Sequence, residues 1–581
     1  MNWNLDDFYL GFDDPKYQED INKLQKLIDE YNQLNDLIKT NDEQNIILTY
    51  IKINQDIVKT VRTLSSFNSL INATDVSNQQ SLVNMAKISK MLNEMTATSV
   101  LFTRYLSNVD LDKYRHNEIV LDNLFQLQKE KESAKYLLTE KEEVLYSKLR
   151  QLSSSSWSQL QSLLTSKLDV SFNNENITLS EARNLAYDND PSVRKNAYEA
   201  ELKAYEKIDE VAAMALSNIK REVVTINDLR GYKNVLEPTL LRSNMKEETL
   251  NAMIEAMLEF RPYFANYLKA KAKYLNHDNG LPFYDLFAPV GKLDKTYSYQ
   301  EAQDIIIKSF NSYSPKLGSY AKKAFDLNWI DPFPKKGKRG GAFCSNQPQL
   351  RQSRILSNFT GSLSDVSTLA HELGHGYHGE IISDNTPLNW SYPMPLAETA
   401  SIFCETIVTN HLLSEISDKE EKLSVLEIAL QGDTQVIIDI LSRYMFETNI
   451  FKLAEGPISK DIMKSEMIKA QKEAYLDGLD HNVLHPYMWL NKGHYYSAGL
   501  NFYNFPYAFG LLFGKGLYAM YLEDKASFIQ NYDKLLALTT KASVEDTAAS
   551  MGIDVTNKDF WISSLNIIKK DIDEVIKLMS L

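Results

Sequence analysis

TLAHELGHGYHGE, residues 368–380, contains three of the nine histidines of the chain within eight positions. The residues just before it, SLSD at 362–365, have the Ser-x-x-Asp pattern in which a serine and an acidic residue cap the first turn of a helix. An apolar run that includes the histidines follows. We therefore expect a helix that begins near residue 363 and carries all three histidines.

The spacing within this helix indicates a metal site. At roughly 100° per residue, His371 and His375 differ by about 40° around the helix, so both imidazoles point to the same side. Two nitrogens placed in this way reach one ion at about 2.0–2.1 Å, the usual zinc–nitrogen distance. Glu372 is rotated off the ligand side but lies close enough to contact a water on the metal. HExxH therefore predicts one zinc ion per chain, with Glu372 as a general base.

A catalytic zinc ion needs a third protein ligand, and the sequence offers two candidates. His378 lies about 20° from His371 around the helix, but three turns of one straight helix present a row of side chains, which surrounds a tetrahedral ion poorly. Glu398 follows Pro395, which can open a second helix, and its apolar neighbourhood implies that its charge has a partner. We favour Glu398, and we expect Glu405, seven residues further on, to orient a ligand histidine.

Composition and charge restrict the partners and the location. A formal net charge of −14 argues against a nucleic-acid partner, because phosphate binding needs a basic surface. The two cysteines, Cys344 and Cys404, are far apart in sequence, which is typical of a protein in a reducing cytoplasm. No secretory signal is visible at the N-terminus, and no stretch reaches the roughly 18 apolar residues of a membrane span. We expect a cytoplasmic protein with no part in a membrane.

Periodic apolar residues predict a mainly α fold. Residues 15 to about 190 contain successive amphipathic patterns, among them Leu82, Met85, Ile88 and Met91 at the spacing of one buried helix face. Such spacing, with very few glycines, is typical of long helices joined by short polar turns.

A helix start and two short strand patterns complete the expected organisation. The acidic residues before Pro191 can cap a helix, and we place a domain boundary there, between an N-terminal helical domain, 1–190, and a catalytic domain, 191–581. Residues 341–348 and 353–361 are the segments with strand patterns, and we expect them to pair as a small sheet just before the histidine helix.

Together these segments resemble oligoendopeptidase F, within the thimet oligopeptidase-like group of zinc peptidases. The resemblance covers nearly the full length and rests on an ordered set of motifs: WNLDDFY, RGYKNVLEPTLLRSNM, LPFYDLFAPVG, ILSNFTGSLSDVSTLAHELGHGYH, AETAS, HYYSAGLNFYNFPYAFG and MGIDVTNKDFW. It implies a two-lobed, clam-like helical fold that encloses a deep substrate channel with the zinc at its floor. It also implies an endopeptidase that acts on short, unfolded oligopeptides, because such a channel excludes folded proteins.

The resemblance also implies roles for residues outside the histidine helix. His494 and Tyr507 match the family's His…Tyr pattern, whose members donate hydrogen bonds to the developing oxyanion. Tyr503 and Tyr496 are further candidates for this role. The segment GAFCSNQ is implied to be an edge strand that binds the substrate backbone. The polar residues that follow, CSNQPQLRQSR, replace the usual aromatic and glycine-rich ones, so the family's side-chain preference is not carried over.

Two other functions fit the same motifs. A non-catalytic peptide-binding protein would keep the fold, with or without the metal, although Glu372 argues against it because binding alone needs no general base. A zinc-dependent hydrolase of another small amide is the third candidate. Peptide cleavage with and without a chelator tests for the peptide-binding protein. A comparison of peptides with acylated amino acids as substrates tests for the hydrolase of another small amide.

Overall fold

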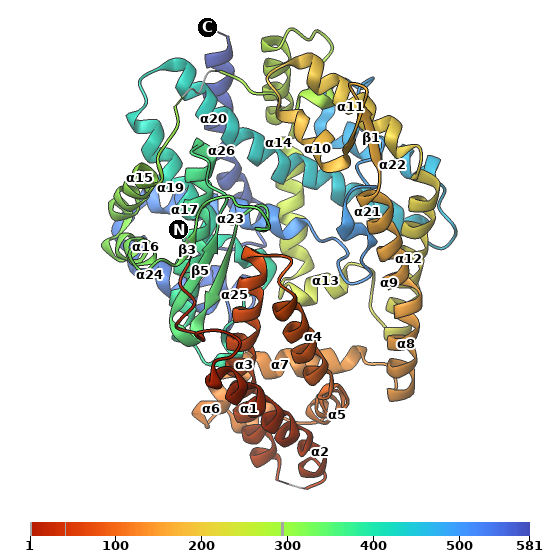
Figure 1. Cartoon of the computed structure of the whole chain (residues 1–581), viewed down its shortest axis with the longest axis vertical. Helices are drawn as coiled ribbons and strands as arrows, with labels where there is room; N and C mark the ends of the chain where they lie inside the picture. Colours follow the sequence, from red (N-terminus) through yellow and green to blue (C-terminus); the bar gives the residue numbers. More distant parts are fainter. Residues whose placement is uncertain (1–2, 41, 292–294, 581) are drawn as a thin grey trace. The chain divides into compact units, whose positions relative to one another are not determined.

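The computed structural model describes residues 3–40, 42–291 and 295–580 of the chain (Figure 1). Helices predominate in these ranges and the strands are few and short, which confirms the predicted mainly α class. The chain forms two compact units, each assembled from three stretches of sequence. Unit 1 contains Met1–Leu137, Lys295–Leu412 and Met520–Gly552, and unit 2 contains Leu138–Asp294, Leu413–Ala519 and Ile553–Leu581.

The boundaries of these units differ from the predicted division of the sequence at residue 190, which lies inside the first stretch of unit 2. The predicted helix start is confirmed: α11, Pro191–Tyr205, begins directly after Asp190, whose side chain accepts a hydrogen bond from the Ser192 N–H. As a division by function, 1–190 and 191–581 stay a prediction.

Two helices, α19 (Thr399–Glu415) and α23 (Phe505–Glu523), cross a boundary between the units, and each has most of its residues in one of them. Unit 1 contains α1 (Pro15–Asn32), α2 (Leu34–Leu37), α3 (Glu43–Thr74), α4 (Gln79–Asn93), α5 (Thr96–Ser107), α6 (Glu118–Asp122), α7 (Leu124–Ser133), α15 (Tyr299–Tyr313), α16 (Pro315–Asp326), α17 (Leu363–Ile382), α18 (Met394–Ala397), α19 (Thr399–Glu415), α24 (Lys525–Leu538) and α25 (Val544–Ala549). Unit 2 contains α8 (Glu140–Leu152), α9 (Ser154–Ser166), α10 (Leu179–Asn184), α11, α12 (Asp209–Arg230), α13 (Glu237–Arg242), α14 (Glu247–Tyr274), α20 (Lys419–Thr434), α21 (Ile440–Leu453), α22 (Lys460–Tyr475), α23 (Phe505–Glu523) and α26 (Lys558–Met579).

A small sheet in unit 1 confirms the predicted strand pair. β4 (Phe343–Gln347) pairs antiparallel with β5 (Gln352–Leu356), and β3 (Ile330–Asp331) adds a parallel partner on the other side of β5. The strand order is β3-β5-β4, so β4 lies at an edge of the sheet. α17 packs against β4 and β5, which places the histidine helix beside the edge strand (Figure 1).

A second sheet, in unit 2, was not predicted. β1 (Asp169–Phe172) and β2 (Glu175–Thr178) form an antiparallel hairpin whose two-residue turn is Asn173 and Asn174. Both asparagines have positive φ, 50° and 65°, which a tight hairpin turn requires and which asparagine tolerates better than most residues. The Asn-Asn pair is the signal in the sequence that would have identified this hairpin.

Capping starts α17 where the sequence predicts it. The Ser362 hydroxyl accepts a hydrogen bond from the Asp365 N–H (3.1 Å), and the Asp365 carboxylate accepts one from the Ser362 N–H (3.0 Å). These two bonds satisfy backbone donors that a helix start otherwise leaves unpaired. The histidine motif therefore begins about two turns after a well-defined helix start.

The predicted buried face of α4 is only partly correct. Ile88 and Met91 are buried, whereas Leu82 is 41% and Met85 38% exposed. Instead, Ser81 is buried at the start of the helix, where its hydroxyl accepts a hydrogen bond from Asn72 of α3 (3.5 Å). The small serine allows α3 and α4 to pack closely at this point. The buried face of α4 therefore includes Ser81 and excludes Leu82.

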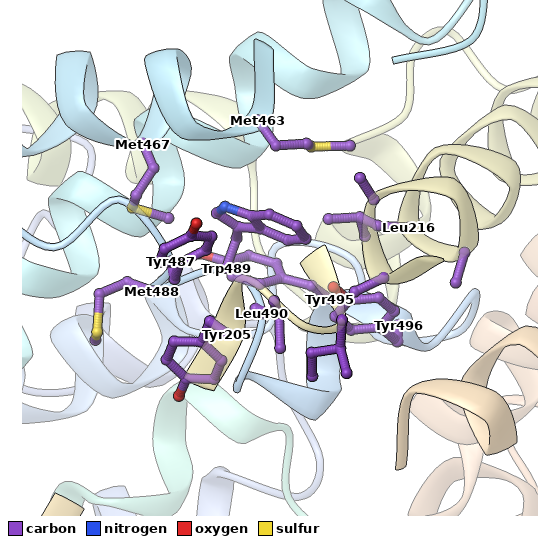
Figure 2. Packing of buried hydrophobic residues seen from close by; sticks show 14 of the residues in the cluster. Tyr205, Leu216, Met463, Met467, Tyr487, Met488, Trp489, Leu490, Tyr495 and Tyr496 are labelled. Carbon is purple, nitrogen blue, oxygen red and sulfur yellow. The ribbon is translucent and has the colours of Figure 1, made fainter. Parts of the chain in front are cut away.

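The core of unit 2 gathers around an aromatic segment near residue 490. Trp489 is fully buried among residues from α12, α22 and the following loop, and Figure 2 shows it together with Leu216, Met463 and Met467. Tyr496 lies in the same cluster and is also fully buried. In the described ranges, no helix combines the length and the apolar character needed to cross a membrane.

Candidate active site

The predicted metal ligands converge in unit 1. Nε2 of His371 lies 3.1 Å and Nε2 of His375 lies 3.4 Å from Oε2 of Glu398. The three ligand atoms all lie within 4.8 Å of one another. Donor atoms at about 2.1 Å from a tetrahedral ion are separated by about 3.4 Å, so these spacings fit zinc. Two imidazoles and one carboxylate are also a usual donor set for catalytic zinc.

A close approach of two helices brings Glu398 to the histidines. Glu398 lies at the junction between α18 and α19, and a Cβ atom added to Gly374 of α17 would lie 2.6 Å from the Ala400 carbonyl oxygen. Only glycine permits this contact between α17 and α19. The Ser401 hydroxyl then donates a hydrogen bond to Oε2 of Glu398 (2.7 Å) and fixes the carboxylate. Ser401 was not among the predicted site residues, although it stands three residues after Glu398 in the motif AETAS.

Glu405 contacts the other side of the His371 ring. Its Oε2 lies 3.1 Å from Nδ1 of His371, and its Oε1 accepts a hydrogen bond from the Ser367 hydroxyl (3.1 Å). A carboxylate at Nδ1 holds the proton on that nitrogen and leaves the lone pair of Nε2 directed at the metal position. Ser367 is a second residue that the sequence analysis did not identify.

The carboxylates and imidazoles of this cluster shift one another's pKa values towards the charged forms. Burial alone would lower the pKa of His371, but hydrogen bonds with Glu398 and Glu405 outweigh it and raise the pKa well above the usual value. Burial alone would raise the pKa of Glu398, but hydrogen bonds with His371 and His375 outweigh it and lower the pKa. Glu398 is therefore held in the ionised form that a metal ligand requires.

Glu372 lies beside the ligands and against the edge strand. Its side chain is 7% exposed, and the backbone N–H of Cys344 in β4 donates a hydrogen bond to its carboxylate. Burial raises the pKa of Glu372, and the nearby His375 and His371 only partly offset this effect. A carboxylate with a raised pKa accepts a proton more readily than a solvated one, as a general base must.

His378 is directed away from the donor atoms. It is fully buried, its ring stacks on Tyr392 at 4.1 Å between centroids, and its Nε2 lies 2.8 Å from Oγ1 of Thr539 in unit 1. Burial lowers the pKa of His378 to about 3, so the ring is neutral. These contacts describe a packed core histidine, whereas Glu398 lies beside His371 and His375; the choice of Glu398 as third ligand stays a prediction.

The candidates in the aromatic segment, His494, Tyr503 and Tyr507, belong to unit 2 and lie together. The hydroxyl oxygens of Tyr503 and Tyr507 are 2.6 Å apart, and the rings of His494 and Tyr503 stack at 5.4 Å. The side-chain amide of Asn504 donates a hydrogen bond to Nε2 of His494 (2.8 Å). The proton of this imidazole is therefore on Nδ1. Tyr496 differs from these tyrosines because its ring lies inside the hydrophobic core (Figure 2).

A buried ion pair holds the backbone just before Tyr503. Nζ of Lys220 donates to Oε1 of Glu447 (2.6 Å) and to Oδ1 of Asn501 (3.0 Å), while Oε2 of Glu447 accepts a hydrogen bond from the Phe502 N–H (2.9 Å). Phe502 has φ +52°, a conformation that costs a bulky residue about 1–2 kcal/mol. The network of Lys220, Glu447 and Asn501 maintains this strained turn and thereby fixes the start of the Tyr503 segment.

Similarity to known proteins extends over most of the chain. A sequence model of peptidase family M3 matches residues 184–567. The chain is 28% identical to the chromosomal oligoendopeptidase F of Lactococcus lactis subsp. cremoris over 396 residues, which cover 67% of this chain and 64% of that relative, just under two thirds. It is 24% identical over 596 residues to an oligoendopeptidase F homolog of Borreliella burgdorferi, covering 99% of this chain and 98% of the relative. A crystal structure of a Chlamydophila abortus protein, 21% identical, has the same fold, with a TM-score of 0.84 over 99% of this chain and 98% of that one.

Proposed function

This chain belongs to peptidase family M3, and we propose that it is a zinc-dependent endopeptidase that hydrolyses internal bonds of short, unfolded oligopeptides. The observation that carries the proposal is the convergence of three donor atoms, from His371, His375 and Glu398, directly beside the buried carboxylate of Glu372. Three protein ligands with an adjacent general base are the arrangement that hydrolysis by a metal-activated water requires.

Glu372 carries the proton transfer in this proposal. A zinc ion at the site supplies a Lewis acid that polarises the scissile carbonyl and makes water more acidic. Glu372 accepts the proton of the attacking water and delivers it to the leaving amine, and its raised pKa suits both steps. Glu405 and Ser401 keep His371 and Glu398 in position while this happens.

His494 and Tyr507 stabilise the oxyanion in this proposal. Burial lowers the pKa of His494 to about 3, with further contributions from the positive charges of Arg443 and Lys220, so the ring stays neutral at physiological pH. With Nε2 accepting from Asn504, the Nδ1–H group is the donor that remains for a substrate. Tyr507 supplies a second donor, and its hydrogen bond with Tyr503 orients its hydroxyl.

β4 binds the peptide backbone in this proposal. An edge strand has backbone N–H and C=O groups that pair with an extended peptide irrespective of its side chains. Because Cys344 of β4 also donates to Glu372, a peptide paired along this strand runs past the general base. Binding through the backbone explains why the substrates would be short and unfolded: a folded protein has few free extended segments to offer.

The proposal is tested with Glu372→Gln, which keeps the size and polarity of the side chain but cannot accept the proton. We expect the variant to keep its full zinc content and to bind a fluorescence-quenched nonapeptide substrate as wild type does. Its kcat should be reduced by about 10²–10⁴-fold. The matched control is Glu380→Gln, because Glu380 lies on the same helix, forms an ion pair with Lys323 and has no part in the proposed chemistry. Mass spectrometry of the products identifies whether internal bonds are cut.

Two outcomes would contradict the proposal. If wild-type protein with one zinc ion per chain binds peptides without cleaving them, the chain is a peptide-binding protein. If Glu372→Gln stays within about tenfold of the wild-type rate at full zinc occupancy, Glu372 is not the base.

A further inference from the structure

Unit 2 contains a cavity of about 260 Å³ that the proposed peptidase reaction does not use. Its walls come from residues 182–187, from α11, from the segments at residues 283–287 and 485–492, and from Gln435, all of them in unit 2. The volume equals that of roughly nine water molecules, which suits a ligand of about ten non-hydrogen atoms.

Aromatic side chains form much of the cavity wall. The rings of Tyr187 and Phe287 lie 4.9 Å apart and those of Tyr198 and Tyr284 lie 5.7 Å apart, measured between centroids. Tyr198 donates its hydroxyl proton to the backbone carbonyl of Leu484 (2.6 Å), so its polar end is satisfied and its ring faces are available for packing. A flat or aliphatic apolar group gains free energy in such surroundings.

Most charges at the cavity are already paired with one another. Arg183 donates to Oε1 of Glu201 (2.6 Å), and Arg194 donates to Oδ1 of Asp285 (2.6 Å). His485 completes the first group, with its Nε2 lying 3.5 Å from Glu201. The positive charge of each guanidinium group is therefore neutralised by its carboxylate partner, and these pairs leave little net charge to attract a ligand.

Lys492 is the exception. It is half-buried and lines the cavity, and no residue in the described ranges forms a hydrogen bond or ion pair with its ammonium group. Burial and the positive charge of Arg443 lower the pKa of Lys492 to about 7. An ammonium group partly removed from water is costly unless a counter-charge reaches it, so at neutral pH Lys492 is fully protonated only when an anion lies beside it.

We propose that this cavity is a binding site for a small monoanionic carboxylate with an aromatic or aliphatic body, in which the carboxylate pairs with Lys492 and the apolar body packs between the aromatic rings. One unpaired cation calls for one negative charge. The apolar walls offer nothing further to a multiply charged anion such as phosphate. The inference stands apart from the proposed peptidase activity, because the cavity wall takes no part in the proposed chemistry; Lys492 affects that chemistry only as the smallest of three positive charges that lower the pKa of His494.

Calorimetric titration of the full chain tests the proposal with three probes: 3-phenylpropanoate, its neutral amide and inorganic phosphate. We expect 3-phenylpropanoate to bind the wild-type protein at one site, and the amide to bind about tenfold more weakly or worse, because it lacks the charge. Phosphate should bind more weakly than 3-phenylpropanoate. Absence of 3-phenylpropanoate binding up to about 10 mM, or preference for phosphate, would overturn the ligand class.

Variants of one residue then locate the site. Lys492→Met should weaken 3-phenylpropanoate binding by about tenfold or more, while Lys492→Arg keeps the charge and stays within about threefold of wild type. Lys469→Met, at an exposed lysine of α22, is the matched control and should bind as wild type does. Unchanged binding by Lys492→Met would show that the probe binds elsewhere, for example at the metal centre, and would refute the proposal.

A stability measurement accompanies the titration. Because Lys492→Met replaces a cation without a counter-ion by an apolar side chain of similar length, we expect the melting temperature to stay the same or rise. A clear fall would show that Lys492 already has a stabilising partner in the protein, which contradicts the argument for an external anion.

Discussion

Nδ1 of His371 lies 3.1 Å from a carboxylate oxygen of Glu405, while Nε2 of the same ring faces Glu398 at 3.1 Å. One carboxylate thus fixes the proton on the ring nitrogen that points away from the metal position, and the other completes the set of metal-binding atoms. The ring cannot rotate without losing one of the two contacts. The metal affinity of this site should therefore depend on a residue that does not itself touch the metal.

Glu405→Gln tests this dependence. The amide keeps the shape of the side chain but removes the charge that makes the His371 imidazole a stronger ligand, and we expect zinc affinity to fall by about 10–100-fold. Competition with a fluorescent chelator measures the affinity directly. Ser367→Ala, which removes only the hydroxyl bonded to the other oxygen of Glu405, should lower the affinity less. Equal affinity of Glu405→Gln and wild type would contradict the prediction.

The identity of the third ligand is tested by a pair of alanine variants. Glu398→Ala should lose zinc because it removes one of the three converging donor atoms. His378→Ala should keep one zinc ion per chain and lose about 1–3 kcal/mol of stability, because it removes a buried hydrogen bond and a ring stacked on Tyr392. Metal analysis by mass spectrometry distinguishes the two, and comparable zinc loss in both would show that His378 is a ligand.

Tyr507→Phe should lower kcat by about 10²–10³-fold with little change in peptide binding, the size expected for one oxyanion donor. The control is Tyr496→Phe, since the Tyr496 ring lies in the hydrophobic core and its hydroxyl has no role in the proposed reaction. Steady-state kinetics on a quenched peptide measure both variants. A loss confined to KM in Tyr507→Phe would assign this tyrosine to substrate binding instead of oxyanion stabilisation.

Glu447→Gln leaves the ammonium group of Lys220 buried without its counter-charge. Since Lys220 and Glu447 are 1% and 2% exposed, we expect the free energy of unfolding to fall by about 3–5 kcal/mol. The matched control is Glu247→Gln in the more exposed pair with Lys233, which should change stability by less than about 1 kcal/mol. Urea unfolding monitored by circular dichroism gives both values, and similar losses in the two variants would exclude the buried network as a source of stability.

His378 should make the protein less stable in acid. Burial lowers its pKa to about 3 in the folded state, whereas an unfolded histidine has a pKa of about 6.5. The unfolded chain therefore binds the proton first: the contribution of His378 is complete above about pH 6.5 and is lost by about 1.4 kcal/mol per unit as the pH falls towards 3.

His378→Gln, which does not titrate, reveals this contribution by comparison with wild type. Its free energy of unfolding should fall less steeply than that of wild type between about pH 6 and pH 4. Urea titrations at several pH values give the slope for each protein. All other acidic and basic groups contribute equally to both slopes, so the difference between the slopes reports His378. Parallel slopes would mean that His378 is protonated in the folded protein.

Features that depend on neighbours within a few residues could be predicted from the sequence alone. The helix start at Ser362, the placement of His371, Glu372 and His375 on adjoining sides of one helix, and the start of α11 at Pro191 all follow from hydrogen bonds and angles within one or two turns. Such relationships are encoded by spacing, because the geometry of a helix is fixed. The mainly α class follows from the same local patterns.

Contacts between distant residues could not be predicted in this way, because they depend on how whole helices pack. Ser401 and Glu405 reach the residues predicted to bind the metal because Gly374 allows α19 to approach α17, and no local pattern reports how closely two helices approach. The exposure of Leu82, predicted to be buried, likewise depends on how α4 packs against α3. Lys492 looks like any other surface lysine in the sequence. In the folded chain it lies at an aromatic cavity, because segments some 300 residues apart in sequence come together around it. The other charged residues of these segments form ion pairs with one another and leave Lys492 without a partner among the described residues, and only three-dimensional packing determines which charges pair.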